Sequence, residues 1–195
     1  MSAARILAPI LLLAALAACT TGGSAPPPTT GPGSPPFDTV SRTTEQGGRF
    51  IALVGPRNQH AEPFLGVPGT NIYALRSWID TRSGETAHQL YVAESYAGAE
   101  RNWNTARDTQ GQSLRFVEIS KNEITCERGC SYVEEFAAAV PEARLRESTG
   151  GLTVAFSAKS GENKTIAVPG DLVRRQLAAV DEARAALPKV TASIR

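Results

Sequence analysis

Cys126 and Cys130 are the pair whose types and spacing could do chemistry together, as a disulfide, a redox dithiol or half of a metal site. Glu127-Arg128-Gly129 separates them, and Gly129 can adopt the positive φ that commonly ends a three-residue hairpin loop. Strands over residues 114–126 and 130–140 would place the two sulfurs opposite each other. In an oxidising compartment we expect a disulfide, worth about 2 kcal/mol for so short a loop.

The alternatives for this pair have less support. A zinc site needs about four ligands, and His60 and His88 are separated in sequence and lack ligand spacing. A redox-active pair usually occurs as Cys-x-x-Cys at a helix start, whereas this pattern is strand, turn and strand. The sequence therefore predicts no metal and no cofactor.

A histidine-based enzyme is the competing hypothesis for the chemistry of the chain. His60 follows Asn58-Gln59, and His88 lies at the edge of a predicted strand, so either could act as a base. The motifs Gly-x-Ser-x-Gly, Gly-x-x-x-x-Gly-Lys-Ser/Thr, Gly-x-Gly-x-x-Gly and His-Glu-x-x-His do not occur. We predict no catalytic residue, and we keep the two histidines as functional candidates.

Four other residues are candidates for buried or recognition sites. Glu134 and Glu135 point to opposite faces of a strand, so they cannot share one site without a bulge. If the face that carries Glu134 is buried, its carboxylate needs a partner such as an arginine. Trp78 is expected in the core of a strand. Trp103, in a polar loop, either plugs that loop or is exposed for recognition.

Alternating apolar and polar residues predict that these side chains are positioned by an antiparallel sheet. Residues 152–158 and 165–168 predict one hairpin with a turn at Gly161, and residues 71–81 and 89–96 predict another. A further strand is expected over 50–54. Residues 55–70 and 98–112 are predicted to be loops because they are rich in Gly, Asn and Asp and lack helical periodicity.

One C-terminal helix is predicted over about residues 169–187. Apolar residues recur at helical spacing from Leu172 to Leu187, Asp171 suits the positive helix end, and Pro188 follows the last turn. The expected fold class is mainly β, either an antiparallel β-sandwich or a curled sheet, with this helix packed on it.

The first 36 residues have a different composition from the rest. Residues 1–18 combine Arg5, an apolar run over 6–16 and two small residues, which is the pattern of a secretory signal. The run is shorter than the about 20 residues of a membrane span. Residues 19–36 are rich in Pro, Gly and Thr and lack bulky apolar residues, which predicts a disordered tether. We therefore expect a single β-rich domain over residues 37–195.

The junction Leu16-Ala17-Ala18-Cys19 resembles the lipobox of bacterial lipoproteins. This resemblance implies cleavage before Cys19, a diacylglycerol on its sulfur and an acyl group on the new amine. Two or three acyl chains give stable anchoring, whereas one chain binds a membrane reversibly. Thr20 after the acylated cysteine, in place of Asp, implies the periplasmic face of the outer membrane.

A group of uncharacterised envelope lipoproteins also resembles this chain. The resemblance rests on the lipobox, on Ile124-Thr125-Cys126 with the segment from Cys130 to Glu134, and on Val168-Pro169-Gly170 before the helix. It covers most of the domain. No activity and no functional residue follow from it.

Charge excludes some classes of function. Removal of residues 1–18 takes away Arg5 alone, so 20 Lys plus Arg become 19 against 19 Asp plus Glu, a net charge of zero. Such a chain lacks the basic field that binds nucleic acid. We expect a membrane-anchored envelope lipoprotein that acts as a non-catalytic interaction or assembly module with an envelope protein partner. The alternative is an envelope hydrolase that acts on cell-wall or lipid substrates.

Overall fold

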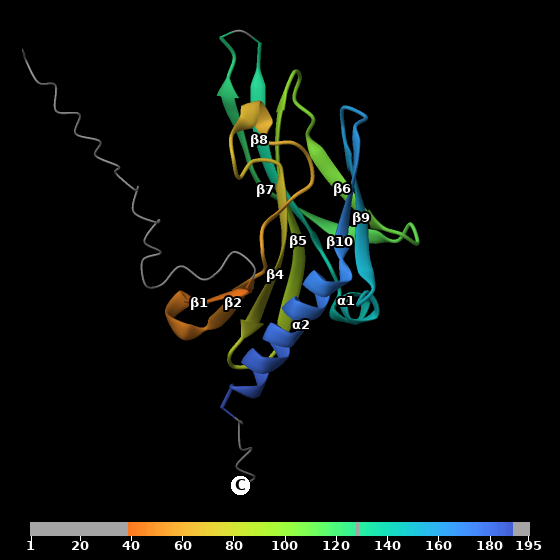
Figure 1. Ribbon diagram of the computed structural model, residues 1–195. Coiled ribbons are helices and arrows are strands. Elements are labelled where there is room, and N and C mark those ends of the chain that lie inside the picture. The colour runs from red at the N-terminus through yellow and green to blue at the C-terminus, as the bar shows by residue number, and fades with distance from the viewer. Residues whose placement is uncertain (1–38, 128, 189–195) are drawn as a thin grey trace, which may run out of the picture. The chain divides into compact units, whose positions relative to one another are not determined.

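The computed structural model describes residues 39–127 and 129–188. This part of the chain forms one open antiparallel sheet of 10 strands, with a C-terminal helix packed on it (Figure 1). The elements, in chain order, are β1 (Ser41–Glu45), η1 (Gln46–Gly48), β2 (Phe50–Val54), β3 (Asn58–Gln59), η2 (Phe64–Gly66), β4 (Ile72–Asp80), β5 (Thr86–Ala97), β6 (Trp103–Asp108), β7 (Ser113–Thr125), β8 (Ser131–Ala139), α1 (Glu142–Glu147), β9 (Gly151–Ala158), β10 (Asn163–Pro169) and α2 (Gly170–Ala185).

The strand order is β1-β2-β4-β5-β8-β7-β6-β9-β10, with β3 added to β4. Strand β7 pairs along most of its length with β8, but pairs with β6 only at Ser113 and Leu114. The sheet turns at this short contact. Strands β6, β9 and β10 therefore pack over the inner face of β4, β5 and β8, and one apolar core lies between the two parts.

Phe136 of β8 is the centre of this core. Its ring centroid lies 5.3 Å from that of Trp103, 5.7 Å from Phe116 and 5.0 Å from Phe156, and Phe136 is 1% exposed. Such aromatic pairs add to the stabilisation that burial of apolar area provides. The four rings come from β6, β7, β8 and β9, so they join the strands on both sides of the turn in the sheet.

Helix α2 packs on both parts of the sheet, contacting β2 and β4 as well as β9 and β10. Its buried residues Val173, Leu177, Val180 and Ala183 recur at helical spacing, as an amphipathic helix requires. The helix begins close to the main chain before β9, because a Cβ placed on Gly170 would lie 2.3 Å from the carbonyl oxygen of Thr149. A residue with a side chain would clash there.

The fold class predicted from the sequence is confirmed, with a curled open sheet rather than two separate sheets. The predicted hairpins correspond to β4–β5, β7–β8 and β9–β10, and the predicted helix to α2. The loop predicted over 98–112 is wrong, because β6 occupies residues 103–108 and pairs with β9. The short elements β1 and α1 were not predicted.

The predicted signal over residues 1–18 and the tether over 19–36 lie outside the described residues. Within residues 39–127 and 129–188, no helix combines the length and the apolar character that crossing a membrane requires.

Candidate functional site

Strands β7 and β8 end in a hairpin tip that carries the predicted disulfide, since Cys126 is bonded to Cys130. The ladder between the strands ends at the pair Thr125 and Ser131, so both cysteines lie just beyond it. Gly129 has a φ of 108°, the positive value that the loop was predicted to need. The disulfide therefore closes the tip of a hairpin that the strand register already forms.

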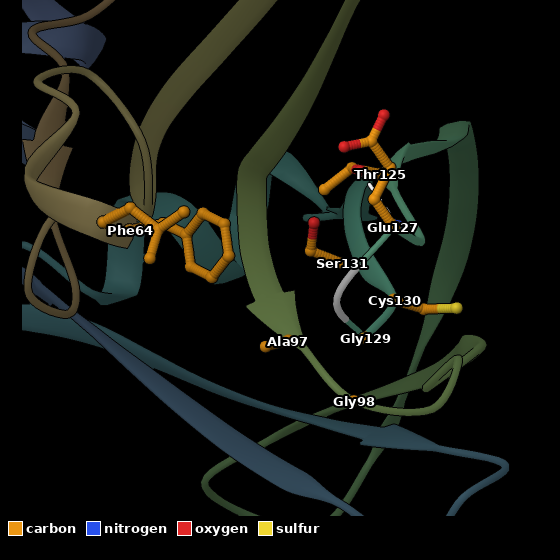
Figure 2. A pocket seen from close by; sticks show the side chains of 9 residues that line it. Phe64, Ala97, Gly98, Thr125, Glu127, Gly129, Cys130 and Ser131 are labelled. Carbon is orange, nitrogen blue, oxygen red and sulfur yellow. Dashed lines mark hydrogen bonds between the residues drawn. The ribbon is translucent and has the colours of Figure 1, made fainter.

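An open cavity of about 580 Å³ lies beside this hairpin tip. One wall is the loop that carries Phe64, the hairpin supplies Glu127 and Ser131, and Ala97 at the end of β5 lies between them (Figure 2). The Ser131 side chain is buried, and its Oγ has no hydrogen-bond partner within the described residues. The volume is typical of ligand sites, which combine apolar walls with a few polar groups.

The loop between β3 and β4 presents a large apolar side chain at this cavity. Leu65 is 83% exposed and has a φ of 51°, a left-handed conformation that costs a residue with a side chain about 1–2 kcal/mol. Thr70 holds the loop, because its Oγ1 accepts from the Phe64 N–H at 2.8 Å and donates to the Val67 carbonyl at 2.7 Å. Strain and exposure thus coincide at one residue in a hydrogen-bonded loop, a combination that occurs at functional sites.

The hairpin exposes two further large apolar side chains, and both are at irregularities of its ladder. The register of β7 shifts between Glu118 and Ser120 and again between Glu123 and Thr125. Ile119 and Ile124 are the residues skipped at these shifts, and they are 41% and 49% exposed. Bulges re-aim side chains and often occur beside functional sites. Neither isoleucine is among the residues that line the cavity. We call Leu65 and Val67, together with the cavity, the apolar end of the domain.

His60 lies in a buried ionic cluster and not on the surface. Its Nε2 is 3.1 Å from the Ala93 carbonyl oxygen, so Nε2 carries the hydrogen, and its Nδ1 accepts from the Lys164 ammonium at 3.4 Å. The buried Glu94 carboxylate lies 3.5 Å from Nε2, 2.7 Å from Arg101 and 2.9 Å from Lys164. Burial lowers the pKa of His60. Two cations pair with one buried carboxylate, so this is a structural ion cluster.

Glu134 is the partner of Glu94 in the β5–β8 register, and its carboxylate is also buried. It accepts hydrogen bonds from the Tyr96 hydroxyl and from the main-chain N–H groups of Asn102 and Trp103, the last two at 3.0 and 3.1 Å. The sequence predicted that a buried Glu134 needs a partner such as an arginine. The partners are instead a phenol and two backbone donors. Burial raises the pKa of Tyr96, which keeps its hydroxyl protonated as a donor.

His88 is buried at the opposite end of the sheet and belongs to a Ser-His-Glu series. Its Nδ1 is 2.8 Å from the Ser77 Oγ, and its Nε2 is 3.7 Å from a Glu142 oxygen, which is beyond hydrogen-bond distance. Burial lowers the pKa of His88. Glu142 is held by Arg184 and Arg146, which lower the pKa of its carboxyl to about 2.

This series does not have the geometry of a nucleophilic site. Ser77 is 0% exposed, and its Oγ accepts a hydrogen bond from the Gln176 side chain of α2 at 2.9 Å, so no substrate can approach it. Within residues 39–127 and 129–188, no group of three or more His, Cys, Asp or Glu side chains is placed to hold a metal ion. The two histidines therefore have structural environments, although the sequence left open that either could be a surface base.

The lowered pKa of both buried histidines predicts that acid destabilises the domain. In the unfolded chain a histidine titrates near pH 6.5, so below that pH the unfolded state binds more protons than the folded state. The free energy of unfolding should be constant above about pH 7.5. It should fall below pH 6.5 by up to about 1.4 kcal/mol per pH unit for each histidine. Urea unfolding at pH 7.5, 6.5 and 5.5 measures the slope, and H60Q and H88Q should each remove about half of it.

Trp103 is a core residue rather than a loop residue. It is 4% exposed in β6 and stacks on Phe136. The side chain is therefore buried, as the prediction of a plug expected, but it lies in a strand and not in a loop. Trp78 is half-buried on β4, less than a core position requires. Leu65 and Ser131 at the cavity, and the bulged isoleucines of the hairpin, were missed. The Gly66 that follows Leu65 is the one sequence signal of the tight turn that exposes it.

The fold and the apolar end define a class of protein, a mainly β domain with an open antiparallel sheet, a C-terminal helix and exposed apolar side chains beside a cavity. No family model, no curated protein and no solved structure matches this chain.

Proposed function

We propose that this chain is a lipid-anchored lipoprotein of the bacterial cell envelope that binds a protein partner through the apolar end of its domain. The single observation that carries the proposal is Leu65, which is 83% exposed with a φ of 51°. Both properties cost stability in the free protein. An apolar side chain from a partner could bury Leu65 and occupy the adjacent cavity.

The envelope part of the proposal is supported by the sequence. Cys19, in its lipobox-like context, lies outside the described residues, as does the Pro/Gly-rich segment that follows it. The Cys126–Cys130 disulfide agrees with export, because disulfides persist in oxidising compartments. The resemblance to envelope lipoproteins supports the same location. Thr20 after the acylated cysteine favours the periplasmic face of the outer membrane.

A photo-crosslinking amino acid at position 67 tests the proposed surface in intact cells. Val67 is 52% exposed beside Leu65, so its replacement should give a discrete crosslinked product that mass spectrometry identifies as one envelope protein. The same amino acid at position 46, in the turn between β1 and β2, is the control and should not give this product. Identical products from both positions would reject the apolar end as the binding surface.

The variant L65G should separate binding from stability. Glycine relieves the positive φ, so the free energy of unfolding should rise by about 0.5–1 kcal/mol, while the yield of the position-67 crosslink should fall about tenfold or more. The matched control is Q46G, because Gln46 also has a positive φ of 49°. Q46G should gain similar stability and retain the crosslink. An unchanged crosslink in L65G would contradict the role of Leu65.

The variant C19A tests the anchor. Without the thiol that carries the diacylglycerol, the protein should move from the membrane fraction to the soluble fraction. At most one acyl chain could then remain, and a single chain binds a membrane only reversibly. Fractionation with immunoblotting measures the distribution. Retention of C19A in the membrane fraction would refute lipidation at this residue, while the crosslinking result would stand independently.

A further inference from the structure

Among the side chains that helix α2 buries against the sheet, one is polar. Its buried residues are apolar except for Gln176, which is 1% exposed. The Gln176 Nε2 donates to the Leu53 carbonyl at 3.1 Å and to the Ser77 Oγ at 2.9 Å. These bonds connect the middle of α2 to β2 and β4, and they contribute directionality that apolar packing does not.

The hydrogen bonds of this cluster favour a neutral His88. Gln176 donates to the Ser77 Oγ, and the Ser77 Oγ lies 2.8 Å from the His88 Nδ1. With Nε2 protonated, Nδ1 accepts from the Ser77 hydroxyl, and every hydrogen of Ser77 and Gln176 in this contact has an acceptor. A protonated His88 carries a hydrogen on both nitrogens. Ser77 would then meet donors from both sides, and its own hydrogen would lose its acceptor.

The charges around His88 come from the two helices and from Arg115 of β7, which lines the same pocket as His88. From α1, Glu142 lies 3.7 Å from Nε2, and Arg146 pairs with Glu142 and with Asp181 of α2. From α2, Arg184 binds both oxygens of Glu142 and donates to the Thr86 hydroxyl at 2.9 Å. On β4, the residue that faces His88 is Ser77, which is neutral. The one nearby carboxylate is therefore already bound by two guanidinium groups, and little of its charge is left to stabilise a cationic imidazole.

We propose that His88 makes the attachment of helix α2 to the sheet sensitive to pH, so that the helix separates locally from the sheet as the pH falls below about 6.5. The ring is 3% exposed, and its Nε2 faces Glu142 of α1, which Arg184 of α2 holds. A proton on Nδ1 removes the acceptor of the Ser77 hydroxyl. Separation of α2 releases the Ser77–Gln176 bond and the Arg184–Glu142 pair, so the opened state accommodates the charged ring better. The apolar end of the domain lies at the other end of β4 and β5, so the opening that His88 drives would begin at the end of the sheet away from the proposed binding surface.

Hydrogen–deuterium exchange on the whole protein tests this inference. Protection factors of α2 amides, corrected for the intrinsic rate, should fall about tenfold between pH 7.5 and pH 5.5, since one proton is taken up on opening. In H88Q the fall should be absent, because a glutamine carbonyl can accept from Ser77 without titrating. H60Q is the matched control and should keep the fall. Equal protection of α2 at both pH values in the natural chain, or an undiminished fall in H88Q, would overturn the proposal.

A measurement without a change at His88 covers the case in which H88Q does not fold. The chain has two histidines, so it has two imidazole Hε1 resonances, and H60Q assigns them. The His88 resonance should titrate below pH 6.5, over the same range in which α2 loses protection. Titration of His88 at or above pH 6.5, or loss of protection in a different range, would disprove the link between the two events.

Discussion

The variant E134A should lower the free energy of unfolding by about 3–5 kcal/mol, the largest effect we expect from a single polar side chain in this domain. Three donors converge on the Glu134 carboxylate, namely the Tyr96 hydroxyl and the N–H groups of Asn102 and Trp103. Tyr96 and Trp103 are 3% and 4% exposed, so water cannot readily replace the lost acceptor. The N–H groups of Asn102 and Trp103 hold the start of β6, and this strand should lose protection first.

Urea unfolding followed by far-UV circular dichroism measures the effect. The control is E135A, one residue along β8, because Glu135 is half-buried on the other face and should cost about 1 kcal/mol or less. E134Q should fall between the two, since an amide keeps one acceptor oxygen but presents a donor to a site that already supplies donors. A loss below about 1 kcal/mol in E134A would mean that the three donors find other acceptors.

The variant F136A should also cost about 3–5 kcal/mol, for a different reason. The Phe136 ring is surrounded by those of Trp103, Phe116 and Phe156 at centroid distances of 5.0–5.7 Å, and its removal leaves a cavity that these rings cannot close without moving their strands. Because Trp103 stacks on Phe136, its fluorescence should change in the folded state. F136L keeps most of the volume and should cost about 1–2 kcal/mol.

The midpoint of urea unfolding, with the m value unchanged, gives this loss of stability. W103F removes the reporter tryptophan and should abolish the fluorescence change, which assigns that change to Trp103 rather than to Trp78. Equal losses in F136A and F136L would show that the shape of the ring, rather than its volume, is what the core requires.

Local sequence patterns were sufficient to predict the hairpins, whose strands pair with the next strand in the sequence. The hairpin around Gly129 could be predicted because the loop length, the glycine and the alternation on both strands agree. Strand β6 was missed because Trp103 and Ala106 are its only apolar residues, and its pairing with β9 joins residues about fifty positions apart. Its strand conformation is therefore set by tertiary pairing rather than by its own pattern.

The candidate site was less accessible to the sequence than the fold. Glu94 and Glu134 become neighbours through the β5–β8 register, and no spacing in the sequence indicates it. Gln176 reads as a polar position on a helix, yet it is buried because Ser77 and the Leu53 carbonyl need a donor. The positive φ of Leu65 and the bulges at Ile119 and Ile124 are properties of the backbone, which hydropathy does not report.

The distance between the two ends of the sheet affects how far from the proposed anchor the apolar end can reach. The described chain begins at Thr39 beside α2, whereas the apolar end lies at the far end of β5, which is 12 residues or about 40 Å long (Figure 1). If residues 19–36 form the tether proposed above, with its anchor at Cys19, a chain of that length and composition would add between about 20 and 50 Å. The length of that tether would then set the effective concentration of Leu65 at a partner. Shortening the tether should change the fraction of partner that is bound, although every contact between the two proteins stays the same.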